Sequence, residues 1–140
     1  MTNSRQFVMF PIGSKRFALC ADMVAELARP DRLQSFPHTT ALFTGVLVRR
    51  GHVIPVCDIA EVLVGSGAPP RKFYLIITRH IGPHTEWTAL PVTGECELTS
   101  AEMVQSTGQL PEYVSGLLSL RDEIVEVIDI EKLISMEAHA

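Results

Sequence analysis

The sequence predicts a mostly β protein built from two copies of one small β unit. Apolar segments of strand length recur along the chain, about nine or ten in number, and turns that contain Gly or Pro separate them, which is typical of small closed or nearly closed sheets. The segment 45–63 also returns 71 residues later as 116–134, with six of the 19 positions identical. A repeat of this kind predicts two related supersecondary units within the 140 residues.

The repeated unit is predicted to be a β-hairpin followed by a short helix. In the first copy, two apolar runs flank the turn Arg49–His52, which contains a Gly and favours a hairpin. Asp58 then stands where a helix needs an N-cap, the helix is expected over Ile59–Val64, and a Gly follows it. Asp129 has the same place in the second copy. We therefore interpret Asp58 and Asp129 as structural caps.

The N-terminal part predicts a further hairpin, in which Phe7–Ile12 and Phe17–Cys20 flank a turn that contains Gly. Pro11 has no backbone N–H to donate, which suggests an edge strand or a bulge at that position. A capping Asp and the spacing of the apolar residues after it predict a short helix over Met23–Ala28. A short strand is expected over Leu33–Phe36.

The second half begins after 65–71, a connector rich in Gly and Pro. Lys72–Thr78 has almost no polar residue, so we expect a strand that is covered on both faces. A polar turn is expected over His80–Glu86 and a return strand over Trp87–Val92. The segment 99–102 matches a capping box and predicts one turn of helix.

These elements predict one domain over residues 5–138, with a first half at about residues 5–66 and a second half at about residues 71–138. A chain of this length buries roughly two-thirds of its unfolded surface, which is enough for a core. A single half of about 65 residues would have a marginal core. We therefore expect the two halves to depend on each other for stability.

Charge and composition disfavour several classes of function. The formal net charge is −4 and the charges are scattered, which disfavours a nucleic-acid-binding protein. No run approaches the ~20 apolar residues that span a bilayer, and no secretory signal is visible. The three cysteines Cys20, Cys57 and Cys96 lack the spacing of metal ligands. We expect them to be reduced, buried thiols in a cytoplasmic protein.

No group of residues predicts catalysis. Asp58 and Asp129 could be imagined as a carboxylate pair, but their equivalent places in the two copies favour capping. His80 and His84 flank a Gly-Pro turn, and His52 lies in a hairpin turn where it could contact a partner. No phosphate-binding Gly loop is present. We therefore predict a protein that is not an enzyme, uses no metal and no cofactor, and acts through its surfaces.

Several motifs together are specific to one family. The run Gly45–Ile59, Gly-Val-Leu-Val-Arg-Arg-Gly-His-Val-Ile-Pro-Val-Cys-Asp-Ile, is similar to a signature in which Gly-Val leads through Asn-Leu-Arg-Gly to Ile-Pro-Val-Ile-Asp-Leu. Upstream stand Phe17-Ala-Leu, Val24-Ala-Glu-Leu and Phe36-Pro, and downstream stand Glu112-Tyr-Val-Ser-Gly and Val127-Ile-Asp-Ile-Glu-Lys-Leu. In this order and spacing, over about residues 5–135, the sequence resembles the CheW family.

The resemblance implies two five-stranded SH3-like β-barrel halves, packed about a shared apolar seam, with a few short helices. It implies a cytoplasmic, non-enzymatic adaptor that couples a chemoreceptor of the methyl-accepting type to a CheA-like histidine kinase in a chemosensory array. The partners would be the helical cytoplasmic tip of the receptor and the regulatory domain of the kinase, without nucleic acid and without insertion into a membrane. By position, the receptor-binding groove would involve Val24, Glu26, Gly45, Arg50, Gly51 and Ile76.

Arg50 is the charged residue that the resemblance singles out. It stands beside Gly51 in the hairpin turn, and its repeat counterpart Arg121 has no Gly after it. The guanidinium of Arg50 could bond loop carbonyls or pair with a carboxylate such as that of Glu26. We therefore expect Arg50 to combine a structural role with receptor binding, and Arg121 to act mainly on stability.

Departures from the family pattern keep other functions open. Val48 stands where the family has Asn, Arg49 stands where it has Leu, and 92–98 lacks the usual Val-Asp-x-Val pattern. One alternative is a divergent chemosensory-like pathway, such as control of type IV pilus twitching. Others are a small-ligand-binding regulatory β domain, with the ligand between the halves, and a structural subunit of a homomeric ring. We also expect a stand-alone adaptor and not a fragment of a kinase, because the sequence starts with Met1 and ends a few residues after the last predicted helix.

Overall fold

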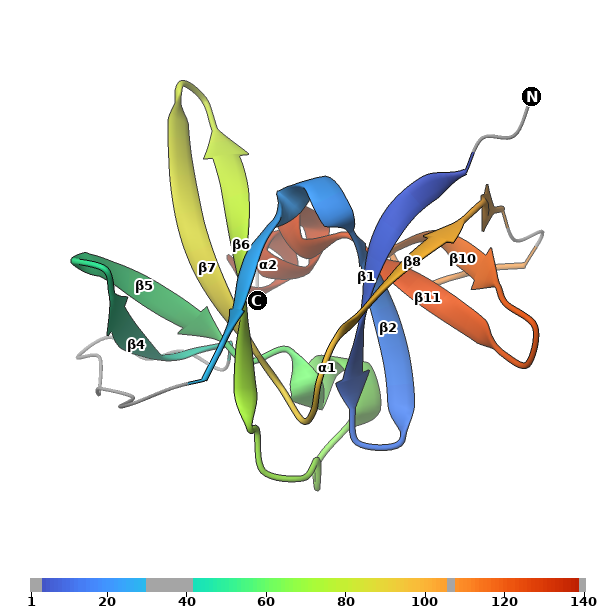
Figure 1. Cartoon of the computed structure of the whole chain (residues 1–140), viewed down its shortest axis with the longest axis horizontal. Helices are drawn as coiled ribbons and strands as arrows, with labels where there is room; N and C mark the ends of the chain where they lie inside the picture. The colour runs from blue at the N-terminus through green and yellow to red at the C-terminus, as the bar shows by residue number, and fades with distance from the viewer. Residues whose placement is uncertain (1–3, 30–41, 106–107, 139–140) are drawn as a thin grey trace.

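The computed structural model describes residues 4–29, 42–105 and 108–138 (Figure 1). These ranges contain eleven strands, two short α-helices and one 3₁₀ turn. In chain order the elements are β1 (Arg5–Ile12), β2 (Lys15–Cys20), η1 (Ala21–Met23), β3 (Val24–Ala28), β4 (Phe43–Arg49), β5 (His52–Cys57), α1 (Ala60–Val64), β6 (Phe73–Ile81), β7 (His84–Val92), β8 (Glu97–Ala101), β9 (Met103–Val104), β10 (Val114–Ser119), β11 (Ile124–Ile128) and α2 (Ile130–Ala138). The prediction of a mostly β protein with a few short helices is confirmed.

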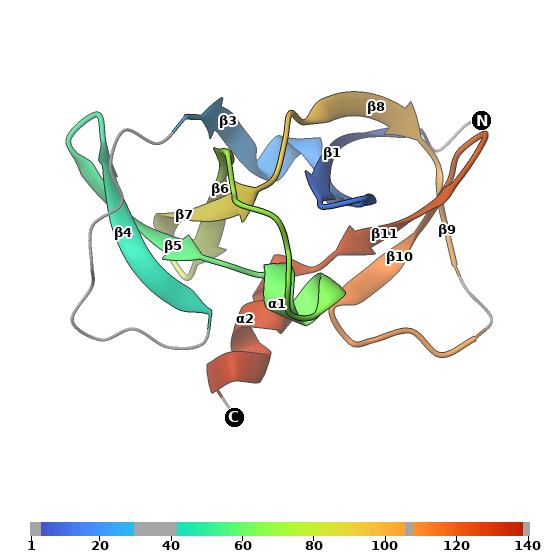
Figure 2. The same cartoon turned by 90° about the horizontal axis from the view of Figure 1, so that it is seen from below.

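The strands form two sheets with the same internal order. The six-stranded sheet has the order β8-β1-β2-β11-β10-β9, and the five-stranded sheet has the order β3-β6-β7-β5-β4. In each sheet a hairpin, β1–β2 or β6–β7, pairs in parallel with the second strand of another hairpin, β11 or β5. The two sheets lie side by side, with α1 and α2 between them (Figure 2). The predicted repeat is therefore present in the fold as well as in the sequence.

The two sheets do not coincide with the two halves of the sequence. The N-terminal hairpin β1–β2 belongs to the six-stranded sheet, whose other strands come from residues 97–128. The hairpin β6–β7 belongs to the five-stranded sheet, whose other strands come from residues 24–57. Each half thus gives its first hairpin to the sheet of the other half. The predicted boundary between 66 and 71 does not separate the two sheets.

Both repeated units contain the predicted hairpin and helix. The Asp58 Oδ1 atom accepts a hydrogen bond from the Ala60 N–H at 3.2 Å, and the Asp129 Oδ1 atom accepts one from the Lys132 N–H at 3.1 Å. These bonds satisfy N–H groups that the first turn of a helix leaves without a partner. Gly65 ends α1 with φ 82°, a conformation that favours glycine.

Two predicted helical segments are strands. Residues 24–28 form β3, which pairs antiparallel with β6, and only Ala21–Met23 form a 3₁₀ turn. Residues 97–101 form β8, which pairs with β1, so the capping-box prediction for 99–102 is wrong. In both cases pairing with a strand distant in sequence overrides the local helix signal.

Other predictions change in detail or cannot be compared. The predicted polar turn over His80–Glu86 is reduced to Gly82 and Pro83, because β6 and β7 pair as far as Ile81 and His84. Pro11 is not in an edge strand, but it lies beyond Met9, where the pairing of β1 with β8 ends. The predicted strand Leu33–Phe36 lies outside the described residues.

Three hydrophobic clusters stabilise the two sheets. The inter-sheet core combines side chains from both sheets and both helices, among them Phe10, Leu19, Leu75, Leu90 and Leu133. A second cluster lies inside the five-stranded sheet and a third inside the six-stranded sheet. Strand β6 contributes to two of them, because alternate side chains of a strand point to opposite faces. The prediction that this strand is covered on both faces is confirmed.

The cysteines differ in burial, contrary to the expectation that all are buried. All three are free thiols. Cys57 is fully buried in the inter-sheet core, whereas Cys20 and Cys96 are half-buried. Burial raises the pKa of the Cys96 thiol to about 11. At neutral pH Cys96 is therefore a protonated, unreactive thiol.

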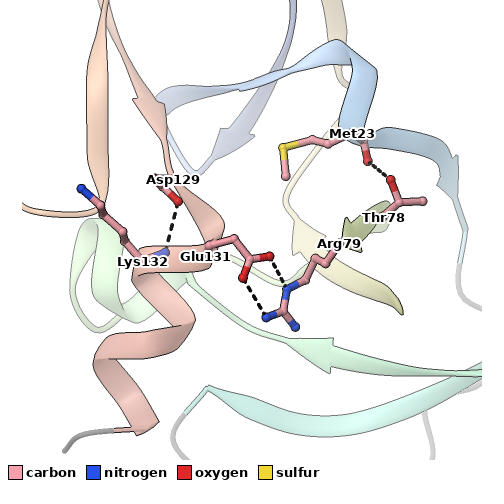
Figure 3. A network of polar contacts seen from close by, with 6 residues as sticks. All are labelled: Met23, Thr78, Arg79, Asp129, Glu131 and Lys132. Atoms are coloured by element: carbon pink, nitrogen blue, oxygen red, sulfur yellow. Dashed lines mark hydrogen bonds and ion pairs between the residues drawn. The ribbon is translucent and has the colours of Figure 1, made fainter. Parts of the chain in front are cut away.

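Polar contacts connect the two sheets where α2 begins. The Arg79 guanidinium on β6 donates from Nε to Glu131 Oε1 at 2.9 Å and from Nη2 to Glu131 Oε2 at 3.2 Å (Figure 3). Thr78 Oγ1, on the same strand, donates to the Met23 carbonyl at 3.3 Å. Because α2 follows the six-stranded sheet and β6 belongs to the five-stranded sheet, the Arg79–Glu131 pair links the two sheets, whereas the Thr78 bond joins β6 to the turn that precedes β3.

Candidate functional site

The β4–β5 turn brings together the charged residues that the sequence singled out. Arg50 and Gly51 form the tip of the turn, and both have positive φ, 52° and 79°. This backbone is that of a two-residue hairpin loop whose twist matches the flanking strands. A non-glycine residue in this conformation is uncommon, so the hairpin turn holds the backbone of Arg50 in a conformation that it would rarely adopt elsewhere.

Glu26 lies next to this turn and is bonded mainly to Arg49. Arg49 donates from Nε to Glu26 Oε1 at 2.7 Å and from Nη2 to Glu26 Oε2 at 2.9 Å. A bidentate pair of this kind is the strongest arrangement of these two groups. The hydrogen bond from Arg49 is the main cause that lowers the pKa of Glu26 below its ordinary value of 4.5, against the opposing effect of burial. Glu26 is therefore ionised at neutral pH.

Arg50 has a weaker bond to Glu26 than the sequence suggested. Its Nη2 atom lies 3.7 Å from Glu26 Oε2, and its side chain is 74% exposed. The sequence analysis missed Arg49 as the main partner, because the family signature has Leu at this position. The signal that could have found Arg49 is charge: both residues next to Gly51 on its N-terminal side are arginines. Arg49 neutralises Glu26, so the guanidinium of Arg50 is available to a partner.

The remaining predicted groove residues do not all reach the surface. Ile76 is 1% exposed in the cluster inside the five-stranded sheet, and Gly45 is buried within β4. Val24 is half-buried against the inter-sheet core. Direct contact of Ile76 or Gly45 with a partner would need the sheet to open, so we correct the candidate site by leaving both out. Glu26, Arg50 and Gly51 lie together at one corner of the molecule.

Two exposed leucines that the sequence analysis missed lie on the edge strands next to the seam. Leu27 on β3 is 38% exposed, and Leu98 on β8 is 61% exposed. Leu27 pairs with Leu75 and Leu98 with Val8, and both of these partners pack against the inter-sheet core. Paired residues share a face of the sheet. Leu27 and Leu98 therefore project on the seam side of their sheets.

Strands β3 and β8 lie on the same side of the molecule, on either side of the connection from β7 to β8 (Figure 2). The leucines were missed because both segments were predicted to be helical or irregular. Once the segments are known to be strands, the alternation of side chains along each strand would indicate Leu27 and Leu98 as exposed aliphatic residues. The candidate site thus has two parts, the seam-side residues Val24, Leu27 and Leu98 and the corner formed by Glu26 and Arg50. Glu26 pairs with Ile76 and so lies on the opposite face of β3 from Leu27.

The candidate site contains no reactive group. Within the residues that the structure describes, no three His, Cys, Asp or Glu side chains come together as a metal site would require. In the same ranges, no helix is long and apolar enough to cross a membrane. What the site offers is exposed apolar side chains and an exposed charged side chain.

Comparisons with known proteins agree with this interpretation. The CheW-like domain model matches residues 6–138. A probable chemotaxis protein CheW from Rhizobium etli is 24% identical over 136 residues, with 94% of this chain and 88% of that protein covered. Chemotaxis protein CheW from Klebsiella aerogenes is 22% identical over 144 residues, with 99% and 87% covered.

A solved structure shows the same fold. The scaffolding protein TtCheW from Thermoanaerobacter tengcongensis superimposes with a TM-score of 0.73 at 19% identity, over 89% of this chain and 88% of that one. The resemblance predicted from the sequence motifs is confirmed by the family match over nearly the whole chain. The protein belongs to the CheW-like domain family.

Proposed function

We propose that this protein is a signalling adaptor that couples a chemoreceptor to a CheA-like histidine kinase. The observation that carries the proposal is the presence of two surface features, exposed leucines on the edge strands β3 and β8 and an exposed arginine at the β4–β5 turn. Such a surface suits an amphipathic helix, because apolar residues on one face of the helix can contact the leucines while a carboxylate meets the arginine. This surface can support recognition of a partner protein.

The partner of this surface is the helical cytoplasmic tip of a receptor. A receptor tip is a helical hairpin, so it presents apolar and charged residues at helical spacing to a groove. The kinase would bind elsewhere on the adaptor through its regulatory domain, so that receptor and kinase can be held at the same time. The proposal includes a cytoplasmic location, because both partners would have their signalling parts there.

The experiment compares two charge reversals at equivalent hairpin tips. Arg50→Glu changes the tip of β4–β5, and Arg121→Glu changes the tip of β10–β11, where Arg121 is also exposed. Binding of the folded variants to a purified receptor signalling fragment and to the kinase is measured by titration calorimetry. We expect Arg50→Glu to weaken receptor binding by about 2 kcal/mol or more, as for a buried charge pair at an interface, and to leave kinase binding unchanged.

Arg121 serves as the matched control. It forms no ion pair with any residue in the described ranges, so its reversal is expected to leave both the melting temperature and receptor binding nearly unchanged. This replaces the expectation from sequence that Arg121 acts mainly on stability. If Arg50→Glu and Arg121→Glu bind the receptor fragment equally well, the β4–β5 corner is not part of the receptor site.

A further inference from the structure

An open notch separates β5 from β7 on the five-stranded sheet. These strands pair in parallel only at Val56 and Ala89. Beyond this point the hairpins β4–β5 and β6–β7 diverge (Figure 1). We name this opening the β5–β7 notch. Its lining consists of side chains from both strands, namely His52, Val53, Pro55, Thr85, Glu86 and Trp87.

The six-stranded sheet contains an equivalent junction between β11 and β2. There the parallel pairing joins Val127 to Ala18. The interval of 71 residues that relates the two copies also relates Val56 to Val127 and Ala18 to Ala89. Each residue of the β5–β7 notch can therefore be compared with its counterpart at the β11–β2 junction, as an internal control within one molecule.

The β11–β2 junction is bridged by two ion pairs. Lys15 Nζ lies 3.2 Å from Glu126 Oε1, and Arg16 pairs with Glu123. Lys15 Nζ also lies 5.1 Å from the centre of the Phe17 ring, within the range of a cation–π contact. Charged side chains of the protein itself thus close this junction.

In the β5–β7 notch, other residues stand in the places of the two ion pairs that bridge the β11–β2 junction. Trp87 and His52 stand in the places of Arg16 and Glu123, and their rings lie 4.4 Å apart. Glu86 stands in the place of Lys15, but the place of Glu126 is taken by Pro55, which carries no charge. Val53 is 65% exposed beside them. The notch therefore has a carboxylate, an aromatic ring and an apolar wall.

The Glu86 carboxylate makes no hydrogen bond or ion pair with any other residue of the described ranges. Arg79 is directly opposite it on β6, but the Arg79 guanidinium is bonded to Glu131 through two nitrogens. An exposed carboxylate beside an aromatic ring and aliphatic groups matches the chemistry of a lysine or arginine side chain, whose stem is apolar and whose end is positive.

We propose that the β5–β7 notch binds an extended segment of a partner protein and takes up one Lys or Arg side chain of that segment. The cation pairs with Glu86 and contacts the Trp87 ring, both of which line the notch. In the other sheet Lys15 also combines a carboxylate, Glu126, with an aromatic ring, although that ring, Phe17, corresponds to Thr88 and not to Trp87. A small aliphatic neighbour in the segment contacts Val53 and Pro55. The notch shares no residue with the candidate receptor site, although its His52 directly follows Gly51, and the inference does not depend on the proposed receptor interaction.

The test uses the whole protein and short synthetic peptides. Trp87 is the only tryptophan of the chain, so tryptophan fluorescence reports on the notch alone. The probe is the capped pentapeptide Ala-Val-Arg-Val-Ala, and the control peptide has norleucine in place of Arg. We expect a saturable fluorescence change with the Arg peptide, at a dissociation constant on the order of 1 mM. The norleucine peptide should produce no saturable change below about 10 mM.

A sealed variant provides the second arm. Pro55→Glu combined with Glu86→Lys copies the Glu126–Lys15 pair into the notch. The double variant should have an unchanged or higher melting temperature. Its affinity for the Arg peptide should be about tenfold lower. Should the double variant not fold, Glu86→Gln removes the charge with little change of shape and should weaken the Arg peptide to the same extent. Equal responses to the two peptides, an unchanged affinity in the folded sealed variant or in Glu86→Gln, or no saturable response to either peptide would overturn the proposal.

Discussion

The two sheets have the same strand order but close by different means. In the six-stranded sheet, β8 is followed after one residue by β9, and β9 pairs with β10 on the far side of the sheet, so backbone hydrogen bonds link the two edges. In the five-stranded sheet, the edge strands β3 and β4 are linked by the side chains of Glu26 and Arg49. A backbone closure depends on side chains only through the room they need, whereas a side-chain closure depends on the identity of the two residues that form it.

This difference explains where the candidate site lies. The corner with Glu26 and Arg50 belongs to the sheet that a side-chain ion pair closes, and exposed charged groups remain there. In the six-stranded sheet β9 pairs with Leu117 and Leu118 of β10, while the equivalent hairpin tip at Arg121 is exposed and has no carboxylate partner in the described ranges. The comparison teaches that two copies of one unit can keep the same strand order and still differ in the charged groups at their equivalent corners. The following changes break or sharpen this comparison, from the largest expected effect to the smallest.

The largest effect is expected from cutting the chain between the two halves. A fragment that ends at Gly67 keeps β1–β2 but loses β11, and keeps β5 but loses β7. Neither sheet can form its central parallel junction, so we expect no cooperative thermal transition and a poorly dispersed NMR spectrum. The two fragments mixed together should recover both. A fragment 1–67 that melts cooperatively by itself would show that the exchanged hairpins are not needed for the fold.

Gly116→Ala is expected to disturb the backbone closure of the six-stranded sheet. A Cβ atom at Gly116 would lie 2.6 Å from Met103 Cγ and 2.7 Å from its sulfur, so the Met103 side chain must move and β9 with it. We expect a loss of about 1–3 kcal/mol in the free energy of unfolding, measured by urea denaturation. Gly116→Ala together with Met103→Ala is the control, since it removes the clash, and a double variant no more stable than Gly116→Ala would contradict this cause.

The two helix caps should differ in how much they contribute to the free energy of unfolding, because only Asp58 also forms an ion pair. Asp58→Ala removes the bond to Ala60 and also the ion pair with Arg71 at 3.0 Å, whereas Asp129→Ala removes a cap alone. We expect a loss of about 1 kcal/mol for Asp129→Ala and a larger loss for Asp58→Ala, each measured by denaturant unfolding. Equal losses would mean that the ion pair with Arg71 contributes nothing measurable.

Removal of the ion pair that closes the five-stranded sheet should have the smallest effect on stability. Glu26→Gln is expected to lower the free energy of unfolding at pH 7 by about 0.5–1 kcal/mol, since the pair is partly exposed. Arg49→Leu and the double variant complete a cycle that isolates the pair. Arg50→Leu is the matched control, and a larger loss there than for Arg49→Leu would contradict the assignment of Arg49 as the main partner.

The same pair predicts a dependence on pH. Because the folded-state pKa of Glu26 lies below its ordinary value of 4.5, the stabilisation is present above pH 4.5 and is lost as the pH falls through the folded-state pKa. The difference in melting temperature between the unchanged protein and Glu26→Gln should therefore be constant from pH 7 to about pH 5 and decrease at lower pH. A difference that grows on acidification would show that the sign of the shift is wrong.

Local signals in the sequence predicted the hairpins and the helices that follow them, because a turn residue or a capping aspartate acts within a few positions. They failed at β3 and β8, whose conformation is set by pairing with β6 and β1. The repeat revealed that two similar units exist, but similarity does not say which unit a hairpin joins. The exchange of hairpins therefore could not be predicted from the pattern.

The candidate site was predicted only in part for the same reason. Glu26 and Arg50 were identified through the resemblance, and the structure places them at one corner. Leu27 and Leu98 could not be identified while their segments were taken as helical or irregular. Ile76 was included although an apolar residue in a strand covered on both faces has no surface to offer.

The exchange of hairpins also sets the order in which the protein can fold during its synthesis on the ribosome. The junction between β5 and β7 joins residues about 30 positions apart, so the five-stranded sheet can form while translation continues. The hairpin β1–β2, made first, must wait for β11, more than 100 residues later, which is roughly 5–20 s at common rates of translation. During this interval its apolar face has no native cover, and nascent chains should therefore be most prone to aggregate, and most dependent on chaperones, before β11 emerges.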